Sequence, residues 1–264
     1  MPPLPYRELK PSPEAEAIYL RWLNHLHAEF SRHPSADRRA EIVRDELFQI
    51  YLGRPHGGKL NTVLASELAG NALQESFDPR NVTLEPEYYG DVDAEQYASR
   101  KALIYFWQMF DRSPLGLNHW LGFRFRCMLG KHIFRHLGSG VKIFHNVEFT
   151  FGYNLTIEDH CTIHKNVMLD DRGEIILREG TSISDFAHIY SHTHDIHHQA
   201  DVTNKVTELG PRARVTYHAT VLAGASIGED AMLGAMGVAT RPVPPASVSV
   251  GIPAKVQRKK NPGN

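Results

Sequence analysis

Aliphatic residues recur at every sixth position through the C-terminal half of this chain. The most regular run is Leu209, Val215, Val221, Ile227, Leu233 and Ala239. A small residue stands four positions after each of the first five, at Ala213, Ala219, Ala225, Ala231 and Gly237. An α-helix turns once in about 3.6 residues and would scatter such positions around its axis. A triangular β-solenoid explains the period, because each unit forms one short strand and one corner with the aliphatic side chain pointing inward. The pattern therefore predicts a parallel β-helix.

The hexad pattern begins earlier and is interrupted twice. The same step links Ile157, Ile163 and Leu169, and then Leu177, Ile183 and Ile189. Two residues are added between Leu169 and Leu177, which predicts a small bulge at a corner. Between Ile189 and Leu209 the spacing is 20 residues, and the segment 191–198 reads Ser-His-Thr-His-Asp-Ile-His-His. Long excursions from a rigid scaffold commonly carry functional residues, so we expect a functional loop outside the solenoid here.

The first 140 residues are predicted to be mainly α-helical. Ser12 followed by Pro13 and two glutamates is a helix start, and apolar residues continue from it at i, i+4 spacing to Phe30. Further helices are expected over 36–52, 61–73 and 94–110. The aromatic residues near position 107 then serve helix packing. The chain thus divides into an α-helical N-terminal region (1–140), a β-helix (141–258) and a basic tail (259–264).

The segment 112–147 has no acidic residue, and its basic residues alternate with aromatic ones. Two interpretations fit this pattern. The segment could contact a membrane surface peripherally or hold an anionic acceptor. Alternatively, it is a linker helix that docks on the open end of the solenoid with its charges in solvent. We favour the linker helix.

Composition restricts the partners and the cellular location that we expect for this protein. The chain has 29 Lys plus Arg against 30 Asp plus Glu, so no overall charge points to nucleic acid. Its two cysteines, Cys127 and Cys161, lack the spacing of a disulfide framework or a thiolate metal site. No apolar run has the length of a signal peptide or a membrane span. We expect a cytoplasmic protein.

Two blocks near the C-terminus carry a family resemblance. Residues 240–245 read Thr-Arg-Pro-Val-Pro-Pro and residues 251–256 read Gly-Ile-Pro-Ala-Lys-Val. Together with the hexads, they resemble the hexapeptide-repeat acyltransferases over residues 141–258. The loop His194-Asp195-Ile196-His197-His198 is similar to the histidine loop of galactoside and maltose O-acetyltransferases. The resemblance implies a left-handed parallel β-helix, acetyl-CoA as co-substrate, and a homotrimer with active sites between subunits.

The histidine loop supplies the candidate catalytic residues. A hydroxyl is a poor nucleophile until a base takes its proton, and histidine titrates near neutrality. His194 matches the catalytic histidine of the family by position, and His192 is the rival candidate. Zinc is the minority interpretation of the cluster, because no cysteine or carboxylate constellation completes a site. We therefore predict no metal.

The resemblance also assigns binding residues. The acceptor pocket would be lined by His164, Asn166, Asp170 and Asp171, although the aspartate pair could equally be a solvated turn. The groove for coenzyme A would be lined by Tyr217, Gly234, Ala235, Thr240, Arg241, Lys255 and Arg258. Cationic side chains suit the phosphates of the cofactor. His164 replaces an asparagine of the galactoside-type enzymes and Tyr217 replaces a small residue, so acceptor and donor details do not transfer directly.

Three functions remain at this point. The leading hypothesis is O-acetylation of a sugar or saccharide hydroxyl. The second is a serine or xenobiotic O-acetyltransferase, since the long helical region is similar in size to that of serine acetyltransferases. However, Leu169-Asp170-Asp171 stands where that family has Leu-Asp-His. The third is a noncatalytic or carbonic-anhydrase-like trimeric solenoid.

Overall fold

The structure is a computed structural model that describes residues 10–57 and 68–260. The helical elements are α1 (Pro13–Arg32), α2 (Ala36–Leu52), α3 (Leu68–Glu75), η2 (Pro79–Asn81), η3 (Glu85–Tyr88), α4 (Ala94–Arg112), η4 (Pro114–Leu117) and α5 (His119–Ile133). The predicted helices over 36–52 and 94–110 are confirmed as α2 and α4. The start of the helix predicted over 61–73 lies outside the described residues, and α3 covers its end.

Helix α1 starts where the sequence indicates. The Ser12 hydroxyl accepts a hydrogen bond from the Ala15 N–H (3.3 Å), and Pro13 occupies the first turn, where its missing N–H costs nothing. The face that α1 buries carries Leu23, Leu26 and Phe30. Ile18, which continues the same i, i+4 spacing, is instead 67% exposed, whereas the adjacent Tyr19 packs against Trp120 at this turn of the helix.

Helices α4 and α5 form an aromatic core with the first coil of the solenoid. The rings of Phe110 and Phe125 stack with centroids 3.8 Å apart. Trp107 is 1% exposed, and its indole N–H donates to the Val147 carbonyl (3.0 Å). The predicted role of these aromatic residues in packing is confirmed.

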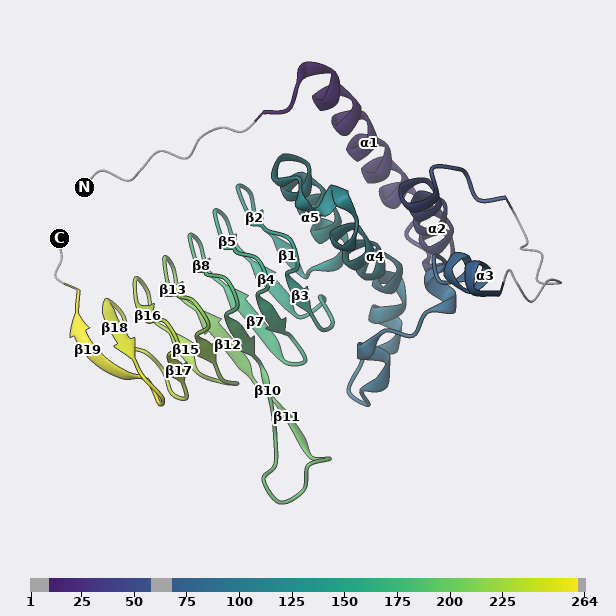
Figure 1. The fold of residues 1–264 in the computed structure, drawn as a ribbon. Coiled ribbons are helices and arrows are strands. Elements are labelled where there is room, and N and C mark those ends of the chain that lie inside the picture. Colours follow the sequence, from purple (N-terminus) through teal and green to yellow (C-terminus); the bar gives the residue numbers. More distant parts are fainter. Residues whose placement is uncertain (1–9, 58–67, 261–264) are drawn as a thin grey trace.

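Helix α5 covers the open end of the solenoid (Figure 1). Two of its aromatic side chains are buried in the protein, Trp120 at 8% and Phe125 at 0% exposure. Arg126 is 1% exposed and forms an ion pair with Asp111, whose other oxygen accepts the Asn146 N–H (2.8 Å). The predicted docking of a linker helix on the open end of the solenoid is confirmed, but its charges are not all in solvent, because Arg126 is buried. The membrane interpretation of 112–147 is wrong, because the apolar face that would enter a lipid surface is already packed against protein.

The remaining chain is a β-solenoid with three faces. Sheet 1 contains β1 (His136–Leu137), β4 (Leu155–Ile157), β7 (Glu174–Leu177), β12 (Val206–Leu209) and β15 (Ser226–Ile227). Sheet 2 contains β2 (Lys142–Ile143), β5 (Thr162–Ile163), β8 (Ser182–Ile183), β13 (Arg214–Val215), β16 (Met232–Leu233), β18 (Ser247–Val250) and β19 (Lys255–Lys259). Sheet 3 contains β3 (Glu148–Phe149), β6 (Met168–Asp170), β9 (His188–Tyr190), β14 (Thr220–Val221) and β17 (Val238–Ala239). Each coil visits the sheets in the order 1, 2, 3, and neighbouring coils pair in parallel. Only β19 pairs antiparallel, with β18, among the ladders of these three sheets.

The hexad positions form the interior, as predicted. Val215, Val221 and Leu233 are all 0% exposed, and the small residues four positions later are buried beside them. The first strand, β1, lies a few residues before position 141 and pairs with β4. Of the basic tail predicted over 259–264, Lys259 is the last residue of strand β19, and positions 261–264 lie outside the described residues. The solenoid thus carries one hydrophobic core along its whole length.

Two corners matter for the site. Corner 2–3 joins sheet 2 to sheet 3 at residues 144–147, 164–167, 184–187, 216–219 and 234–237. Corner 3–1 joins sheet 3 to sheet 1 at residues 150–154, 171–173, 191–205, 222–225 and 240–242. The long interruption predicted after Ile189 projects from corner 3–1 at mid-height, and it contains an antiparallel hairpin of β10 (His192–His194) and β11 (Val202–Asn204) (Figure 1). No helix in the described ranges is long and apolar enough to cross a membrane.

Candidate functional site

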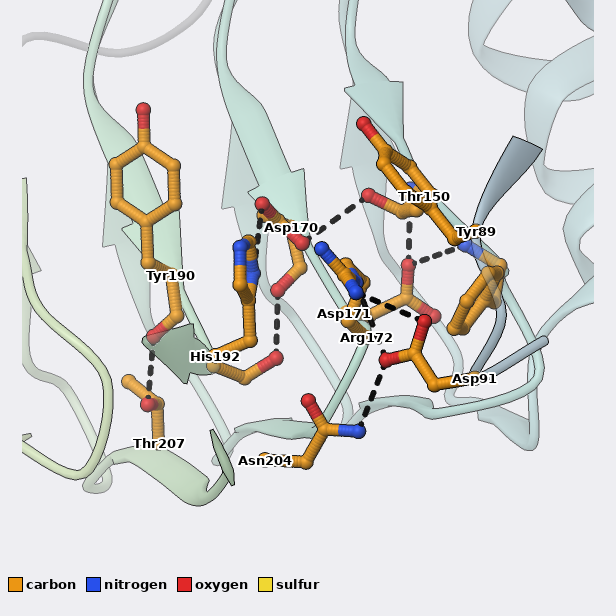
Figure 2. Close-up of polar contacts among 12 residues, drawn as sticks. Tyr89, Asp91, Thr150, Asp170, Asp171, Arg172, Tyr190, His192, Asn204 and Thr207 are labelled. Carbon is orange, nitrogen blue, oxygen red and sulfur yellow. Dashed lines mark hydrogen bonds and ion pairs between the residues drawn. The ribbon is translucent and has the colours of Figure 1, made fainter. Parts of the chain in front are cut away.

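The candidate site lies at corner 3–1, at the base of the β10–β11 hairpin. Figure 2 shows the segments that meet there: the ends of β6 and β9, the bulge after β6, the start of the hairpin, and a piece of the N-terminal region around Asp91. The bulge and the hairpin are the two interruptions of the hexad pattern. They lie on adjacent coils at the same corner, because β6 and β9 are neighbours in sheet 3 with Asp170 opposite Tyr190.

His192 faces the Asp170 carboxylate. Its Nδ1 atom lies 3.1 Å from Asp170 Oδ2, and both side chains are nearly buried, at 13% and 10% exposure. The second oxygen of Asp170 accepts from the Thr150 hydroxyl (3.2 Å). The distance between His192 and Asp170 allows an ion pair when the imidazole is protonated. His192 Nδ1 is, however, not aligned for a hydrogen bond with any described residue. Asp170, predicted to bind the acceptor, is placed to orient a histidine.

His194 is exposed on the same face of the hairpin. Alternate residues of a strand share a face, and the rings of His192 and His194 meet edge to face with centroids 5.2 Å apart. His194 Nδ1 lies 2.6 Å from the Gln199 carbonyl oxygen. Because a carbonyl can only accept, this nitrogen carries the proton and Nε2 keeps its lone pair. Asp195 does not orient either ring, since its carboxylate accepts the N–H groups of His197 and His198.

The burial of Asp171 contradicts its predicted role in acceptor binding. Its side chain is 0% exposed, and one carboxylate oxygen accepts the N–H groups of Thr150 (2.9 Å) and Phe151 (2.8 Å). The other oxygen accepts the Asn154 N–H (3.3 Å). Burial raises the pKa of Asp171 to about 7, and these backbone hydrogen bonds oppose that rise. Asp171 therefore tethers two coils of the solenoid and is not available to a substrate. The alternative of a solvated turn is also wrong.

His164 and Asn166 lie away from the histidine loop. They occupy corner 2–3, at the opposite end of strand β6 from Asp170. His164 stacks on Phe144 and lies 3.7 Å from Asp185, and burial lowers the pKa of its imidazole. Asn166 lines a cavity of about 370 Å³ between α4 and sheet 3, together with His188 and Arg112. A single chain therefore does not unite the four residues predicted to bind the acceptor.

The residues predicted to bind coenzyme A fall on three parts of the surface. Tyr217, which is 56% exposed, lies at corner 2–3 beside the Gly234–Ala235 turn of the next coil, and its carbonyl accepts the Met236 N–H (2.9 Å). Thr240 and Arg241 are exposed at corner 3–1. Lys255 and Arg258 are exposed on β19. Thr240 lies on the same edge as Asp170 but three coils further along, about 14 Å away at the spacing of paired strands.

Sequence reasoning missed the contribution of the N-terminal region. Asp91 accepts hydrogen bonds from Arg172 in the bulge and from Asn204 on β11. Burial raises the pKa of Asp91, but the Arg172 and Asn204 hydrogen bonds and the Arg172 charge outweigh it and hold the pKa below its usual range. No sequence pattern signals this contact, because Asp91 and Asn204 are 113 positions apart. No group of three or more His, Cys, Asp or Glu in the described residues is placed to hold a metal ion.

Known proteins resemble this chain both in sequence and in structure. A scan against protein-family models finds no match. A Staphylococcus aureus (strain COL) protein named as an acetyltransferase is 29% identical over 131 residues, which cover 48% of this chain and 66% of that protein. Galactoside O-acetyltransferase of Escherichia coli (strain K12) is 22% identical over 135 residues, covering 50% of this chain and 66% of the enzyme. The chain thus spans just under two thirds of the length of these relatives.

Solved structures share the solenoid. The maltose O-acetyltransferase of Clostridium difficile 630 superposes with a TM-score of 0.57 at 18% identity, over 66% of this chain and 91% of that one. Galactoside acetyltransferase in complex with coenzyme A superposes with a TM-score of 0.58 at 21% identity, over 66% of this chain and 86% of that one. The chain has the left-handed β-helix fold of hexapeptide-repeat acetyltransferases. The predicted fold class and family resemblance are confirmed.

The similarity to these solved structures extends beyond the solenoid into the helical region. The superposition covers about two thirds of the chain, which is more than the solenoid alone contributes from β1 onward. The candidate site draws on both parts, because Asp91 precedes α4 while the two histidines belong to the solenoid's hairpin. Any account of function must therefore include the N-terminal region.

Proposed function

We propose that this hexapeptide-repeat protein transfers an acetyl group from acetyl-CoA to a hydroxyl of a sugar or saccharide, with His194 as the general base. The observation that carries the proposal is the orientation of the His194 ring on an exposed hairpin that leaves the solenoid at mid-height. The names of relatives, which include a galactoside O-acetyltransferase and a colanic acid biosynthesis acetyltransferase, support a saccharide acceptor. Serine or xenobiotic hydroxyls are the alternative acceptors.

His194 has the geometry that a base needs. The Gln199 carbonyl holds the proton on Nδ1, so Nε2 is free to accept the proton of the acceptor hydroxyl. The acceptor oxygen then forms a bond to the thioester carbonyl carbon. As the carbon–sulfur bond breaks, the imidazolium returns its proton to the leaving thiolate, and the histidine is restored. The Gln199 carbonyl stabilises the imidazolium between these two steps, because it accepts a hydrogen bond from the charged ring.

His192 and Asp170 lie beside His194 at the base of the hairpin. The Asp170 carboxylate lies 3.1 Å from His192 Nδ1, and the His192 ring meets His194 edge to face. His192 thus limits the rotation of His194 toward the solenoid wall. If the acceptor approaches from the wall of the solenoid, His192 is the rival base, oriented by a carboxylate instead of a carbonyl.

The donor groove is proposed to lie between two copies of the chain. Tyr217 and Ala235 stand at corner 2–3, whereas Thr240 and Arg241 stand at corner 3–1 on the other edge of sheet 3. The two edges face apart within one solenoid, so one groove can use both only when copies pack side by side, as in the expected homotrimer. Lys255 and Arg258, exposed on β19, supply cations for the phosphates of coenzyme A.

The test compares three histidine variants in an assay that measures release of free coenzyme A. His194→Ala should lower kcat about a thousandfold, within the range for loss of a general base, with unchanged oligomer mass. His198→Ala is the matched control, because its contacts in the hairpin are made by its backbone, and it should stay within about twofold of the native rate. If His192→Ala removes turnover while His194→Ala retains it, the base is His192.

The acceptor class is tested in the same assay. Sugars, oligosaccharides, serine and hydroxyl-bearing antibiotics are offered with acetyl-CoA, and the acceptor with the highest kcat/KM defines the class. Release of coenzyme A that depends on none of these acceptors would contradict the proposed transferase function. In that case a noncatalytic solenoid would account better for the protein.

A further inference from the structure

A loop of the helical N-terminal region reaches the catalytic hairpin. Asp91 lies between η3 and α4, and its carboxylate receives the Arg172 guanidinium through Nε (3.1 Å) and Nη2 (2.9 Å). The oxygen that faces Nε also accepts the Asn204 side-chain N–H (3.1 Å). Figure 2 shows the contacts that join Asp91 to both partners. One carboxylate therefore joins the bulge after β6 to strand β11.

Contacts on both sides of Asp91 in the sequence hold the loop that carries it. The Arg172 side chain is 6% exposed and lies over the Tyr89 ring, 4.2 Å from its centroid. Two residues later, the Asp93 N–H donates to the Tyr153 hydroxyl of the first coil (2.9 Å), and the Asp93 carboxylate caps α4. The loop is thus anchored at both ends, so it can serve as a fixed point for the hairpin.

Asn204 stands on the same face of the hairpin as the two histidines. It is the direct cross-strand partner of His192, and side chains of directly opposed residues project to one face. His194 lies on that face as the alternate residue of β10. The hydrogen bond from Asn204 to Asp91 therefore restrains the face that carries the proposed base.

The hairpin has few other attachments. Its base is packed on Gly173, where an added Cβ would lie 2.4 Å from the Lys205 carbonyl and 2.5 Å from the Ser191 carbonyl. Beyond that base, two polar side-chain contacts link the strands β10 and β11 to the rest of the described chain: His192 with Asp170, and Asn204 with Asp91. One contact comes from each strand. Loss of either would let the hairpin tilt about its base.

We propose that Asp91 and Asn204 are positioning residues, through which the helical N-terminal region sets the tilt of the hairpin and with it the place of the catalytic histidine. The inference rests on the proposed function for its kinetic consequence. Its structural half does not, because the tilt of the hairpin can be measured without turnover.

The decisive variant is Asn204→Ala, which removes the link to the hairpin and leaves the Asp91–Arg172 ion pair in place. Asn204 is exposed, so the variant should fold normally. Amide hydrogen exchange of residues 192–204 should become about tenfold faster, while exchange in β13 to β16 stays unchanged. In the coenzyme A release assay kcat should fall about tenfold, and KM for acetyl-CoA should change less than about twofold.

Thr203→Ala is the matched control. Thr203 is the exposed neighbour of Asn204 and points to the other face of β11, so both exchange and kcat should match the native protein. Asp91→Ala should lose at least as much as Asn204→Ala, because it also leaves the nearly buried Arg172 unpaired, and the double variant should lose no more than Asp91→Ala alone. This lack of additivity is expected when two residues act through one contact.

Two results would overturn the proposal. In the first, Asn204→Ala shows the exchange and kcat of Thr203→Ala. In the second, the exchange of the hairpin accelerates but kcat stays native, which would show a tether without a positioning role. If the native protein transfers acetyl to no acceptor, the proposed function fails, whereas faster hairpin exchange in Asn204→Ala would still support the link to Asp91.

Discussion

Asp171 offers a quantitative test of how burial controls charge in this solenoid. The side chain is 0% exposed, and burial raises its pKa from 3.8 to about 7 despite hydrogen bonds from several backbone N–H groups. In the unfolded chain the carboxyl regains its ordinary pKa. The folded state therefore binds the proton more tightly than the unfolded state over the pH range between these two values.

The raised pKa of Asp171 makes the protein less stable as the pH rises. Because the pKa is raised in the folded protein, the stabilising contribution is complete below the unfolded pKa and is lost as the pH rises through about 7. Each unit of pKa difference corresponds to about 1.4 kcal/mol, so integration from about pH 5.5 to 7.5 gives a loss of about 2 kcal/mol in the free energy of unfolding. Asp171→Asn, which cannot titrate, should lack this slope.

The assay is urea unfolding followed by tryptophan fluorescence at a series of pH values. The quantity of interest is the difference in unfolding free energy between the native protein and Asp171→Asn, because other titrating groups cancel in it. That difference should shift by about 2 kcal/mol in favour of the variant from about pH 5.5 to 7.5. Parallel profiles would refute the reasoning, and would mean that the N–H groups of Thr150, Phe151 and Asn154 keep the carboxylate ionised throughout.

Two further changes test the packing around the site and the solenoid end. Gly173→Ala would place its Cβ against the backbone carbonyls of Lys205 and Ser191, so the base of the hairpin must move. We expect kcat to fall about a hundredfold while the circular dichroism spectrum is retained. A native kcat would contradict this geometry. Asp111→Ala leaves the buried Arg126 guanidinium without its carboxylate and should lower the free energy of unfolding by about 3–5 kcal/mol in urea. Adding Arg126→Met should recover part of that loss, and no recovery would show that the buried charge is not its cause.

The solenoid could be predicted from sequence because its rule is local and repeated. Leu209, Val215 and Val221 each stand at the inward position of their own coil, and each coil repeats the same strand and corner. The start of α1 at Ser12 and Pro13 was readable for a similar reason, since a capping hydroxyl acts on an N–H three residues away. The interruption of the hexad pattern after Ile189 also predicted a loop outside the solenoid, and the structure has the β10–β11 hairpin there.

The predicted acceptor set shows where sequence reasoning stopped. His164 and Asp170 are six residues apart, yet a strand of sheet 3 separates them and places them at different corners. Asp170 and Asp171 are adjacent, yet one faces His192 and the other is buried under three backbone N–H groups. Alternation along an extended chain sends neighbours in opposite directions, so adjacency does not imply a shared role.

By itself, the sequence determined the β-helix, the helices that precede it, and the two places where the regular coil is broken. Those features depend on period and on contacts between residues close in the chain. Only the tertiary structure decided that Asp91 meets Asn204, that Asp170 faces His192, and that His194 Nδ1 faces the Gln199 carbonyl. Such contacts depend on how the helical region docks and how the coils stack, and a hydrogen bond across 113 positions leaves no mark in local spacing.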